Sequence, residues 1–350
     1  MKGVVFAAGY GRRLHPLTVK RPKHLLPIAG KPLLLRVLEA LKNVGVAEIG
    51  VTVGYMADKI IEVIKPVGVT PIRQSLIAGT GQALKECRPF LEGEDRFFVV
   101  YGDITVTSSK LAALIEFTDN GGYDGSLLAV HGAGDGRYGV VQVKDSLFQY
   151  VAEKSLEGGL VNAGIYILPN QVLEIVDNLP KSPRGEYELT DGLNMLARAG
   201  VKIGVLADPG DWWYDVGRPL DYLHANQHYI SQELGDDLLV GSDVSFGNGV
   251  SVKGPVMLSD RVKIGEGSVL VGPIIVGAES EIAPHSYIAN SVLMERVRIA
   301  DRCSLSNSVI SDETEILSEV LVENGCIPGL VTSSGSRIES RITVATTTII

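Results

Sequence analysis

The side chains with the most obvious chemical use are the cations near the start of the chain. The first 36 residues hold eight Lys or Arg, and no Asp or Glu appears before Glu39, although the whole chain has a net charge of −9. Gly9 and Gly11 stand directly before the pair Arg12-Arg13. A glycine-rich turn lets backbone N–H groups approach a ligand, and guanidinium groups neutralise phosphate oxygens. The pattern predicts a phosphate-binding loop.

The sequence before this loop separates it from simpler basic segments. A β-type run over 3–7 comes directly before the glycines, which argues against a targeting leader or a merely solvated basic face. The loop also differs from two common nucleotide motifs. A dinucleotide fingerprint needs a third nearby glycine, and the second strand candidate, ending at Gly54, lacks the ribose-binding acid. A Walker loop needs Gly-Lys followed by Ser or Thr, and the segment has none.

A carboxylate that could hold a metal ion ends another strand candidate. Asp103 comes just after the apolar run 97–101. In α/β sheets ligands gather at the carboxyl edge of the strands, and Mg²⁺ prefers hard oxygen ligands of this type. A lone Asp at the end of a strand is also a common turn former.

The longer string around the loop is more specific than its glycines. It reads Ala7-Ala8-Gly9-x-Gly11-x-Arg13-Leu14-x-Pro16-Leu17-Thr18, then Pro22-Lys23-x-Leu25-Leu26-Pro27-Ile28, then Gly30-Lys31-Pro32. It resembles the opening of the sugar-1-phosphate nucleotidylyltransferases, of the glucose-1-phosphate thymidylyltransferase or UDP-sugar pyrophosphorylase type, with Arg12 in place of the family's usual Thr. The resemblance continues in order through Gln74, Gly79-Thr80, Tyr101-Gly102-Asp103, Tyr138-Gly139-Val140-Val141, Glu153-Lys154, Asn162-Ala163-Gly164-Ile165-Tyr166, Arg184 to Asp191, and Trp213-Tyr214-Asp215-Val216-Gly217.

The resemblance implies a role for each matched residue. It assigns Arg13 to the β- and γ-phosphates, Lys23 to the α-phosphate and Lys154 to the sugar phosphate, as the catalytic cations. Nucleotide binding is implied for Ala8, Gly9, Gly11, Gln74, Gly79 and Thr80, with the Gln74 amide able to donate and accept at a base edge. Sugar binding is implied for Gly139, Glu153 and Asn162, and Mg²⁺ binding for Asp103 and Asp215.

The reaction implied is nucleotidyl transfer from an NTP to a sugar 1-phosphate, which gives an NDP-sugar and pyrophosphate. A phosphate monoester is already a nucleophile, so alignment and charge stabilisation suffice, and no Ser-His or Cys-His constellation is required. We expect UTP or dTTP as the donor and glucose 1-phosphate or N-acetylglucosamine 1-phosphate as the acceptor. A mannose-1-phosphate guanylyltransferase stays open, because guanylyl-transferring relatives also carry Gly-Thr at 79–80.

The elements that must position these residues form an α/β, Rossmann-like nucleotidyltransferase domain over 1–235. Short β-branched runs alternate there with helical periodicity, as in a doubly wound sheet. Strands are predicted over 3–8, 48–53, 69–73, 96–101, 124–130, 139–143, 162–168 and 202–206. Helices are predicted over 32–43, 57–64, 82–90, 111–117, 171–176, 189–198 and 219–231.

A different periodicity begins after Gly235. Ten apolar residues recur in six-residue steps from Val240 to Met294, a pattern typical of a parallel β-helix built from hexapeptide repeats. The pattern predicts a step of five at Ile299, a failure at Ser311 and a recovery at Leu317. We expect an all-β, left-handed β-helix domain over 236–325, as in long members of the family, and a cap or tail over 326–350.

Two further hypotheses for function come from other classes. The β-helix could be an acyltransferase with His285 as its base, which would make the protein bifunctional. A non-catalytic regulatory subunit is the other, but such a chain would be expected to lose Arg13, Lys23, Asp103 or Asp215, and all four are present.

Composition limits the partners and the compartment. The acidic chain lacks a membrane-length apolar run, and its net charge argues against bulk nucleic-acid binding. Its three scattered cysteines indicate no disulfide framework. We therefore expect a cytoplasmic enzyme that assembles as a homo-oligomer through the β-helix.

Overall fold

The computed structural model describes residues 1–132, 136–153 and 158–320, together with the backbone of five short strands between 322 and 349. Its internal contacts divide the chain into two units. The first, which we call the sheet unit, comprises Met1–Tyr10 and Leu33–Asp215, and the second, the repeat unit, comprises Gly11–Pro32 and Val216–Ile350. The basic N-terminal loop thus groups with the C-terminal part of the chain. The domain boundaries at 235 and 325 stay predictions.

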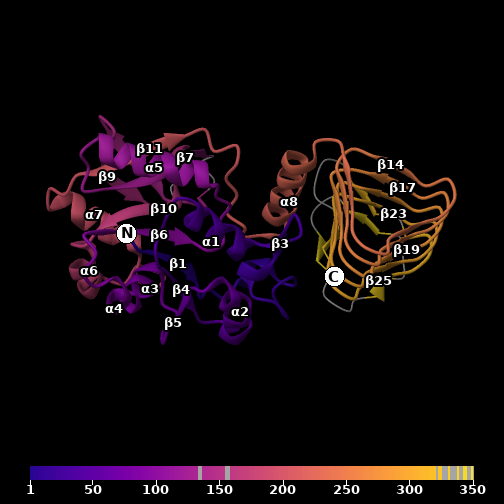
Figure 1. Ribbon diagram of the computed structural model, residues 1–350, viewed down its shortest axis with the longest axis horizontal. Helices are drawn as coiled ribbons and strands as arrows, with labels where there is room; N and C mark the ends of the chain where they lie inside the picture. The colour runs from indigo at the N-terminus through magenta and orange to yellow at the C-terminus, as the bar shows by residue number, and fades with distance from the viewer. Residues whose placement is uncertain are drawn as a thin grey trace. The chain divides into compact units, whose positions relative to one another are not determined.

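A nine-stranded sheet forms the centre of the sheet unit (Figure 1). Its order is β5 (Thr70–Arg73), β4 (Ile49–Val53), β1 (Gly3–Ala7), β6 (Arg96–Tyr101), β10 (Gly159–Pro169), β7 (Gly125–Gly132), β11 (Ile203–Asp208), β9 (Leu147–Ala152) and β8 (Val140–Lys144). Every predicted strand is present, and β9 is an addition. β1 pairs in parallel with β4 and β6, whereas β10 runs antiparallel to β6 and β7, so the α/β class is confirmed with a mixed sheet.

The central parallel strands β1, β4 and β6 are mostly apolar because both of their faces are covered. All five residues of β1 and of β4 are buried. The side chains of Phe6, Phe97, Val99 and Tyr166 join one core cluster. The packed core therefore fixes the carboxyl ends of β1, β4 and β6. The residues that follow these strands lie at one edge of the sheet.

The helices follow the predicted order. They are α1 (Leu33–Asn43), α2 (Ala57–Ile64), α3 (Thr80–Glu86), α4 (Arg88–Leu91), α5 (Ser108–Asn120), α6 (Val172–Ile175), α7 (Leu189–Arg198) and, in the repeat unit, α8 (Pro219–Leu234). The single helix predicted over 82–90 is divided at Cys87, and α4 has a proline in its first turn, where the missing N–H costs no hydrogen bond. Among the described residues, no helix has the length and apolar character to cross a membrane.

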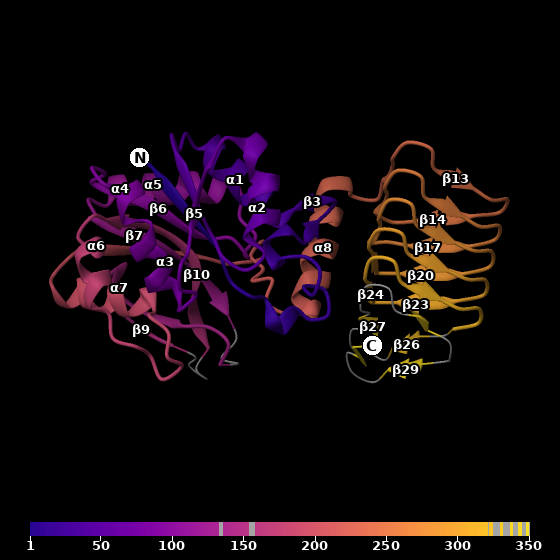
Figure 2. The same cartoon turned by 90° about the horizontal axis from the view of Figure 1, so that it is seen from below.

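The repeat unit stacks short parallel strands into three sheets (Figure 2). The first sheet holds β12 (Leu238–Val240), β15 (Val256–Leu258), β18 (Ile274–Val276), β21 (Val292–Leu293), β24 (Val309–Ile310), β27 (Leu330–Val331) and β30 (Thr348–Ile349). The second holds β13 (Ser245–Phe246), β16 (Lys263–Ile264), β19 (Glu281–Ile282), β22 (Arg298–Ile299), β25 (Glu315–Ile316) and β28 (Arg337–Ile338). The third holds β14 (Ser251–Lys253), β17 (Val269–Val271), β20 (Tyr287–Ala289) and β23 (Ser304–Ser306), and β26 (Val322–Asn324) pairs with β29 (Ile342–Val344). Parallel, repeating strands are as predicted, while the left-handed winding stays a prediction.

The register of the repeat differs from the predicted one. Leu293, Ile310 and Ile316 join the buried core of the unit, so the core positions predicted at Met294 and Leu317 are each wrong by one residue. At the predicted failure, Ser311, the core position is instead filled by Ile310. The first step of five falls at Leu293 rather than at Ile299.

The cause of the shift is a shorter corner. Val271 pairs with Ala289, and Ile275 pairs with Val292, so the turn loses one residue between these two pairs. Early turns close with a Gly-Pro pair, as at Gly272-Pro273, whereas the later turns place a single asparagine, Asn290 or Asn307, at positive φ. Asparagine tolerates this conformation, so the corner can be shorter.

Candidate active site

The first group of candidate residues lies where β1, β4 and β5 end. The carbonyl oxygen of Ala8 accepts the Tyr55 N–H at 3.0 Å, and the Gln74 N–H donates to Val53 at 2.9 Å. A Cβ at Gly54 would lie 2.9 Å from the Ala8 oxygen, so the two loops are in close contact. The structure thus places Ala8, Gly9 and Gln74 at one edge of the sheet. The Gln74 side chain donates to the Leu76 carbonyl at 2.9 Å, which orients the amide within its own loop.

Gly79 and Thr80 begin α3 and are fastened to a distant segment, 186–189. The Gly81 N–H donates to the Tyr187 oxygen at 2.7 Å, and the Tyr187 N–H donates to the Ala78 oxygen at 2.8 Å. The Thr80 hydroxyl accepts the Leu189 N–H at 2.9 Å. Gly79 has φ +101°, and a Cβ there would lie 2.5 Å from the Tyr187 oxygen. Only glycine permits this approach, so Gly79 has a structural role that the sequence did not reveal.

The three residues predicted to bind the sugar come together. The Asn162 N–H donates to the Gly139 carbonyl at 2.9 Å. A Cβ at Gly139 would lie 3.2 Å from Oε1 of Glu153, so the missing side chain leaves room for that carboxylate. Lys154, the predicted sugar-phosphate ligand, lies outside the described residues.

Two tyrosine hydroxyl groups, of Tyr101 and Tyr166, connect the cluster of Gly139, Glu153 and Asn162 to α3. We call them the tyrosine row. Nδ2 of Asn162 donates to the Tyr166 oxygen at 2.6 Å, and the Tyr166 hydroxyl donates to the Tyr101 oxygen at 3.2 Å. Tyr101 is in turn hydrogen-bonded to Thr80. Burial raises the pKa of both phenols well above the usual value, so they also resist ionisation in mildly alkaline solution. Sequence reasoning assigned neither tyrosine a role, although both lie in matched motifs.

A hydroxyl group, an arginine and a second carboxylate surround the other side of Glu153. The Thr190 hydroxyl donates to Oε1 of Glu153 at 2.7 Å, and an Nη2 nitrogen of Arg184 lies 3.9 Å from Oε2. The same nitrogen lies 2.7 Å from Glu188. Burial raises the pKa of Glu188, with the charge of Arg184 opposing the shift and that of Glu153 adding to it. The segment 184–190 therefore supplies polar groups to the cluster that sequence reasoning did not single out.

The two predicted metal ligands are neighbours across a backbone bridge. Asp215 pairs in antiparallel fashion with Ile104, the residue after Asp103. The Thr105 N–H donates to the Tyr214 oxygen at 3.0 Å, and the Tyr214 N–H donates back to the Thr105 hydroxyl at 2.7 Å. This exchange brings the two carboxyl-bearing backbones to the same edge of the sheet.

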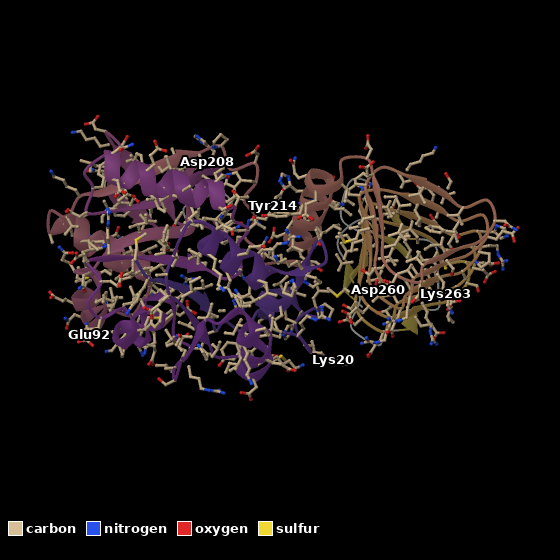
Figure 3. The ribbon with its side chains drawn as sticks, viewed as in Figure 1. Lys20, Glu92, Asp208, Tyr214, Asp260 and Lys263 are labelled. Atoms are coloured by element: carbon tan, nitrogen blue, oxygen red, sulfur yellow. The ribbon has the colours of Figure 1, made fainter. Side chains whose placement is uncertain are left out.

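The loop that ends at Asp215 is braced from its other end by Asp208. This carboxylate accepts hydrogen bonds from Lys110 at 2.6 Å, from the Trp212 indole at 2.7 Å and from the Gly210 N–H at 3.0 Å. Asp208 and Tyr214 are labelled in Figure 3. The bracing helps to fix the position of the loop that carries Asp215.

The donor set of Asp103 and Asp215 fits Mg²⁺. No group of three or more His, Cys, Asp or Glu that could hold a metal ion occurs in the described part of the chain. Mg²⁺ usually keeps several waters and binds through one or two carboxylates together with substrate phosphates, so two carboxylates at a strand edge suffice.

The remaining predicted residues, Gly11, Arg13 and Lys23, belong to the repeat unit. The loop folds on itself: the Thr18 hydroxyl donates to the Gly11 carbonyl at 2.9 Å. Gly11 has φ +67°, and a Cβ there would lie 3.1 Å from Cβ of Lys23. Arg13 is exposed and Lys23 is half-buried. The arrangement keeps Lys23 against Gly11 while leaving the Arg13 guanidinium in solvent.

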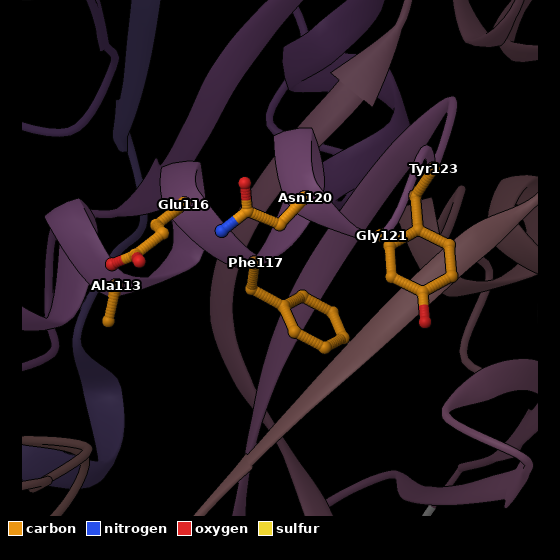
Figure 4. Close-up of a pocket in the computed structure, with 6 residues that line it drawn as sticks. All are labelled: Ala113, Glu116, Phe117, Asn120, Gly121 and Tyr123. Carbon is orange, nitrogen blue, oxygen red and sulfur yellow. The ribbon is translucent and has the colours of Figure 1, made fainter.

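A shallow depression on α5 is lined by none of the residues described above. It is formed by Ala113, Glu116, Phe117, Asn120, Gly121 and Tyr123 (Figure 4). None of its lining residues is a candidate site residue, and it plays no part in the site.

Two family models match the chain. The model described as Nucleotidyl transferase matches residues 2–232, and the model described as GMPPB C-terminal domain matches residues 252–350. The two matches together span most of the chain and leave residues 233–251 between them.

Named relatives match over nearly the whole length. A bifunctional protein GlmU of Methanococcus maripaludis is 32% identical over 323 residues, covering 90% of this chain and 74% of the relative. A probable mannose-1-phosphate guanylyltransferase of Oryza sativa is 29% identical over 344 residues, covering 94% and 91%. Among solved structures, a putative glucose-1-phosphate thymidylyltransferase from Bacillus anthracis has 29% identity and a TM-score of 0.57, covering 65% of this chain and 94% of that one.

Proposed function

We propose that this chain, which belongs to the nucleotidyl transferase family, uses UTP or dTTP to convert glucose 1-phosphate or N-acetylglucosamine 1-phosphate into an NDP-sugar. The relatives show the chain to be a nucleotidyltransferase that acts on sugar 1-phosphates. The choice of base and sugar is the proposal. The observation that carries the sugar-binding part of the proposal is the polar cluster of Gly139, Glu153 and Asn162, which the tyrosine row connects to Thr80.

The polar cluster is suited to a sugar ring. Glu153 offers a carboxylate to hydroxyl groups, while Thr190 and Arg184 hold that carboxylate in place. Asn162 is fixed by two of its own hydrogen bonds, to the Tyr166 hydroxyl at 2.6 Å and from the Gly164 N–H at 3.1 Å. Side chains oriented before the substrate arrives lose little entropy on binding. In this proposal Lys154 holds the sugar phosphate.

The chemistry is a direct displacement. An oxygen of the sugar phosphate forms a bond to the α-phosphorus of the NTP, and the bond from that phosphorus to the pyrophosphate oxygen breaks. Arg13 and Lys23 neutralise the charge that grows on the phosphates, and the loops at Ala8, Gly9 and Gly79 hold the nucleotide in line. Mg²⁺, held by Asp103 and Asp215, would supply further positive charge at the phosphates.

Guanylyl transfer to mannose 1-phosphate is a second candidate. A relative named as a probable mannose-1-phosphate guanylyltransferase matches 94% of this chain and is itself covered to 91%, so the two chains have nearly the same extent. The C-terminal model named for GMPPB also matches 252–350. Gln74 is the residue on which the choice depends, because one amide presents different partners to a pyrimidine and to a purine edge.

An acetyl-transferring repeat unit is a third candidate, favoured by relatives described as bifunctional. His285, its predicted base, is exposed at a corner with φ +60°. A Cβ at Gly267 would lie 2.6 Å from the His285 ring, so the histidine packs over a glycine of the preceding turn. This packing against Gly267 gives the His285 ring a structural role at the corner that requires no catalysis.

A pyrophosphate-release screen tests the first two proposals, and an acetyl-transfer assay tests the third. Four NTPs are crossed with the 1-phosphates of glucose, N-acetylglucosamine, mannose and galactosamine, with Mg²⁺ present. Activity with UTP or dTTP and a glucose-type sugar is expected. Activity confined to GTP and mannose 1-phosphate would select the second candidate. Acetyl transfer from acetyl-CoA to glucosamine 1-phosphate that is lost in His285→Ala would select the third.

A further inference from the structure

The basic loop and the repeat meet at two adjacent ion pairs within the repeat unit. Nη2 of Arg21 lies 3.2 Å from Oδ2 of Asp312, and Nζ of Lys20 lies 3.6 Å from Oε2 of Glu313. Two consecutive cations of the loop therefore face two consecutive acids at a corner of the repeat. None of these four residues is among the candidate catalytic or binding residues.

The two pairs differ in solvent exposure. The side chains of Arg21 and Asp312 are 25% and 17% exposed, whereas those of Lys20 and Glu313 are 63% and 46% exposed. Exposed pairs contribute little because water and salt screen them, and partly buried pairs are screened less. The pair of Arg21 and Asp312 is thus the stronger attachment.

The carboxylate of Asp312 is itself fixed. Its second oxygen, Oδ1, accepts the backbone N–H of Glu295 from the preceding turn at 3.1 Å. One oxygen is therefore anchored in the repeat and the other holds the loop. An aspartate bound at both oxygens cannot turn without losing a hydrogen bond.

Glu313 stands at the end of a column of corner residues with alternating charge. Asp243, Arg261, Glu279, Arg296 and Glu313 occupy equivalent corners, all at positive φ. Arg261 lies 2.5 Å from Glu279, and Arg296 lies 2.9 Å from Glu313. Lys20 adds the next positive charge to this series.

Holding Arg21 fixes the catalytic cation two residues later. Pro22, with φ −65°, separates Arg21 from Lys23, and the Pro22 carbonyl accepts the Leu25 N–H at 2.9 Å. Proline locks φ, so the position of Arg21 is transmitted to Lys23 with little freedom. The other end of the loop is held as well, because the Ala29 N–H donates to Oδ1 of Asn226 on α8 at 3.0 Å.

We infer that Asp312, acting through Arg21, is a positioning residue for nucleotidyl transfer. It belongs to the repeat and holds the Lys23 segment in the conformation that meets the NTP phosphates. The repeat then contributes to the reaction without touching a substrate. This inference rests on the proposed function, in which Lys23 binds a phosphate.

A double-mutant cycle in the full-length protein tests the inference. Asp312→Asn keeps the acceptor for Glu295 and removes the charge, and Arg21→Gln removes the other partner. We expect each single variant to lower kcat/KM for the NTP about fivefold to tenfold, the scale of a partly buried pair. The double variant should lose no more than either single variant. The control is Glu319→Gln, which breaks a more exposed pair of the repeat, with Arg302 at 3.1 Å, and should match the wild type.

The kinetic constants separate positioning from simple destabilisation. A displaced Lys23 raises KM for the NTP and lowers kcat, while KM for the sugar 1-phosphate stays unchanged. A loss of folded protein lowers kcat alone. Additive effects, wild-type kinetics for Asp312→Asn, or equal losses in Glu319→Gln would overturn the positioning role while leaving the proposed function intact. A wild-type protein with no pyrophosphate release in the screen would overturn both.

Discussion

The repeat unit and the sheet unit place their residues by different rules. Between Leu238 and Ile316 of the repeat, paired residues are 17 or 18 positions apart, as Ile264 pairs with Ile282 and Ile299 with Ile316. In the sheet unit, the contacts that shape the site span much greater distances, such as Thr80 with Leu189 and Thr105 with Trp212. An insertion in the repeat therefore disturbs mainly the adjacent turns. An insertion in the sheet unit also displaces residues that are more than a hundred positions away in the sequence.

The largest effect is expected for the carboxylates at the sheet edge. Asp103→Asn should lower kcat by at least a hundredfold, about 3 kcal/mol, because one ligand of the metal is lost where charge develops. Urea unfolding should show an unchanged fold. A matched acid outside the site is Glu116 on α5, and Glu116→Gln should keep wild-type turnover. Full activity of Asp103→Asn in EDTA would contradict the metal assignment.

The next effect concerns the long-range junction at Gly79. Gly79→Ala should lower the free energy of unfolding by about 3 kcal/mol, because it combines a strained φ with a clash against the Tyr187 backbone. Gly68→Ala is the control, since Gly68 also has positive φ, at +73°, but a Cβ there meets no described atom within 4 Å. That variant should lose about 1 kcal/mol. Equal losses in chemical denaturation would show that strain alone, and no close approach, requires glycine at 79.

A smaller, pH-dependent effect is expected at Asp208. Burial raises its pKa, but hydrogen bonds from Lys110, Trp212 and Gly210 outweigh burial and lower the pKa below its usual 3.8. The stabilisation is therefore present above the unfolded pKa and is lost as the pH falls through the folded value. The stability difference between wild type and Asp208→Asn should be clear at about pH 7 and shrink below about pH 4.

The control for Asp208 is an ion pair on the surface with a similar distance between its charged atoms. Asp58 lies 2.7 Å from Arg73 but is 91% exposed. Asp58→Asn should change stability little at either pH, because solvent screens the pair. A pH dependence of the same size in both variants would show that the bracing of the 208–215 loop has no special role.

The smallest effect is expected at a corner of the repeat. Replacing Asn290 with Gly-Pro restores the longer corner and should lower the free energy of unfolding by less than about 1 kcal/mol, since it lengthens a surface connection. An alanine inserted between Val99 and Val100 of β6 is the comparison. It reverses the faces of a strand whose four central residues are buried and should prevent folding. Similar tolerance of both insertions in thermal melts would remove the distinction between the units.

The sequence allowed the fold class and the order of the elements to be predicted, because apolar runs and periodicity are local properties. The exact register of the repeat could not be predicted. Val292, Leu293 and Met294 are all apolar, so a six-residue period cannot choose among them, and the choice depends on the length of the Asn290 corner.

The candidate site was predictable only where motifs matched the family. The structure brings Gly139, Glu153 and Asn162 together, although their assignment to sugar binding stays a prediction. The tyrosine row and the support of Glu153 by Thr190 were missed, because they depend on contacts across the sheet unit. No spacing in the sequence records such contacts.

The buried tyrosine row also gives the protein an internal optical probe. Burial raises the pKa values of Tyr101 and Tyr166, so these phenols resist ionisation while the sheet unit is folded. The stabilisation they provide is complete below the unfolded pKa of about 10 and is lost as the pH rises through the folded values. The tyrosinate absorption of these two rings should therefore appear in alkali only when the interior opens to water.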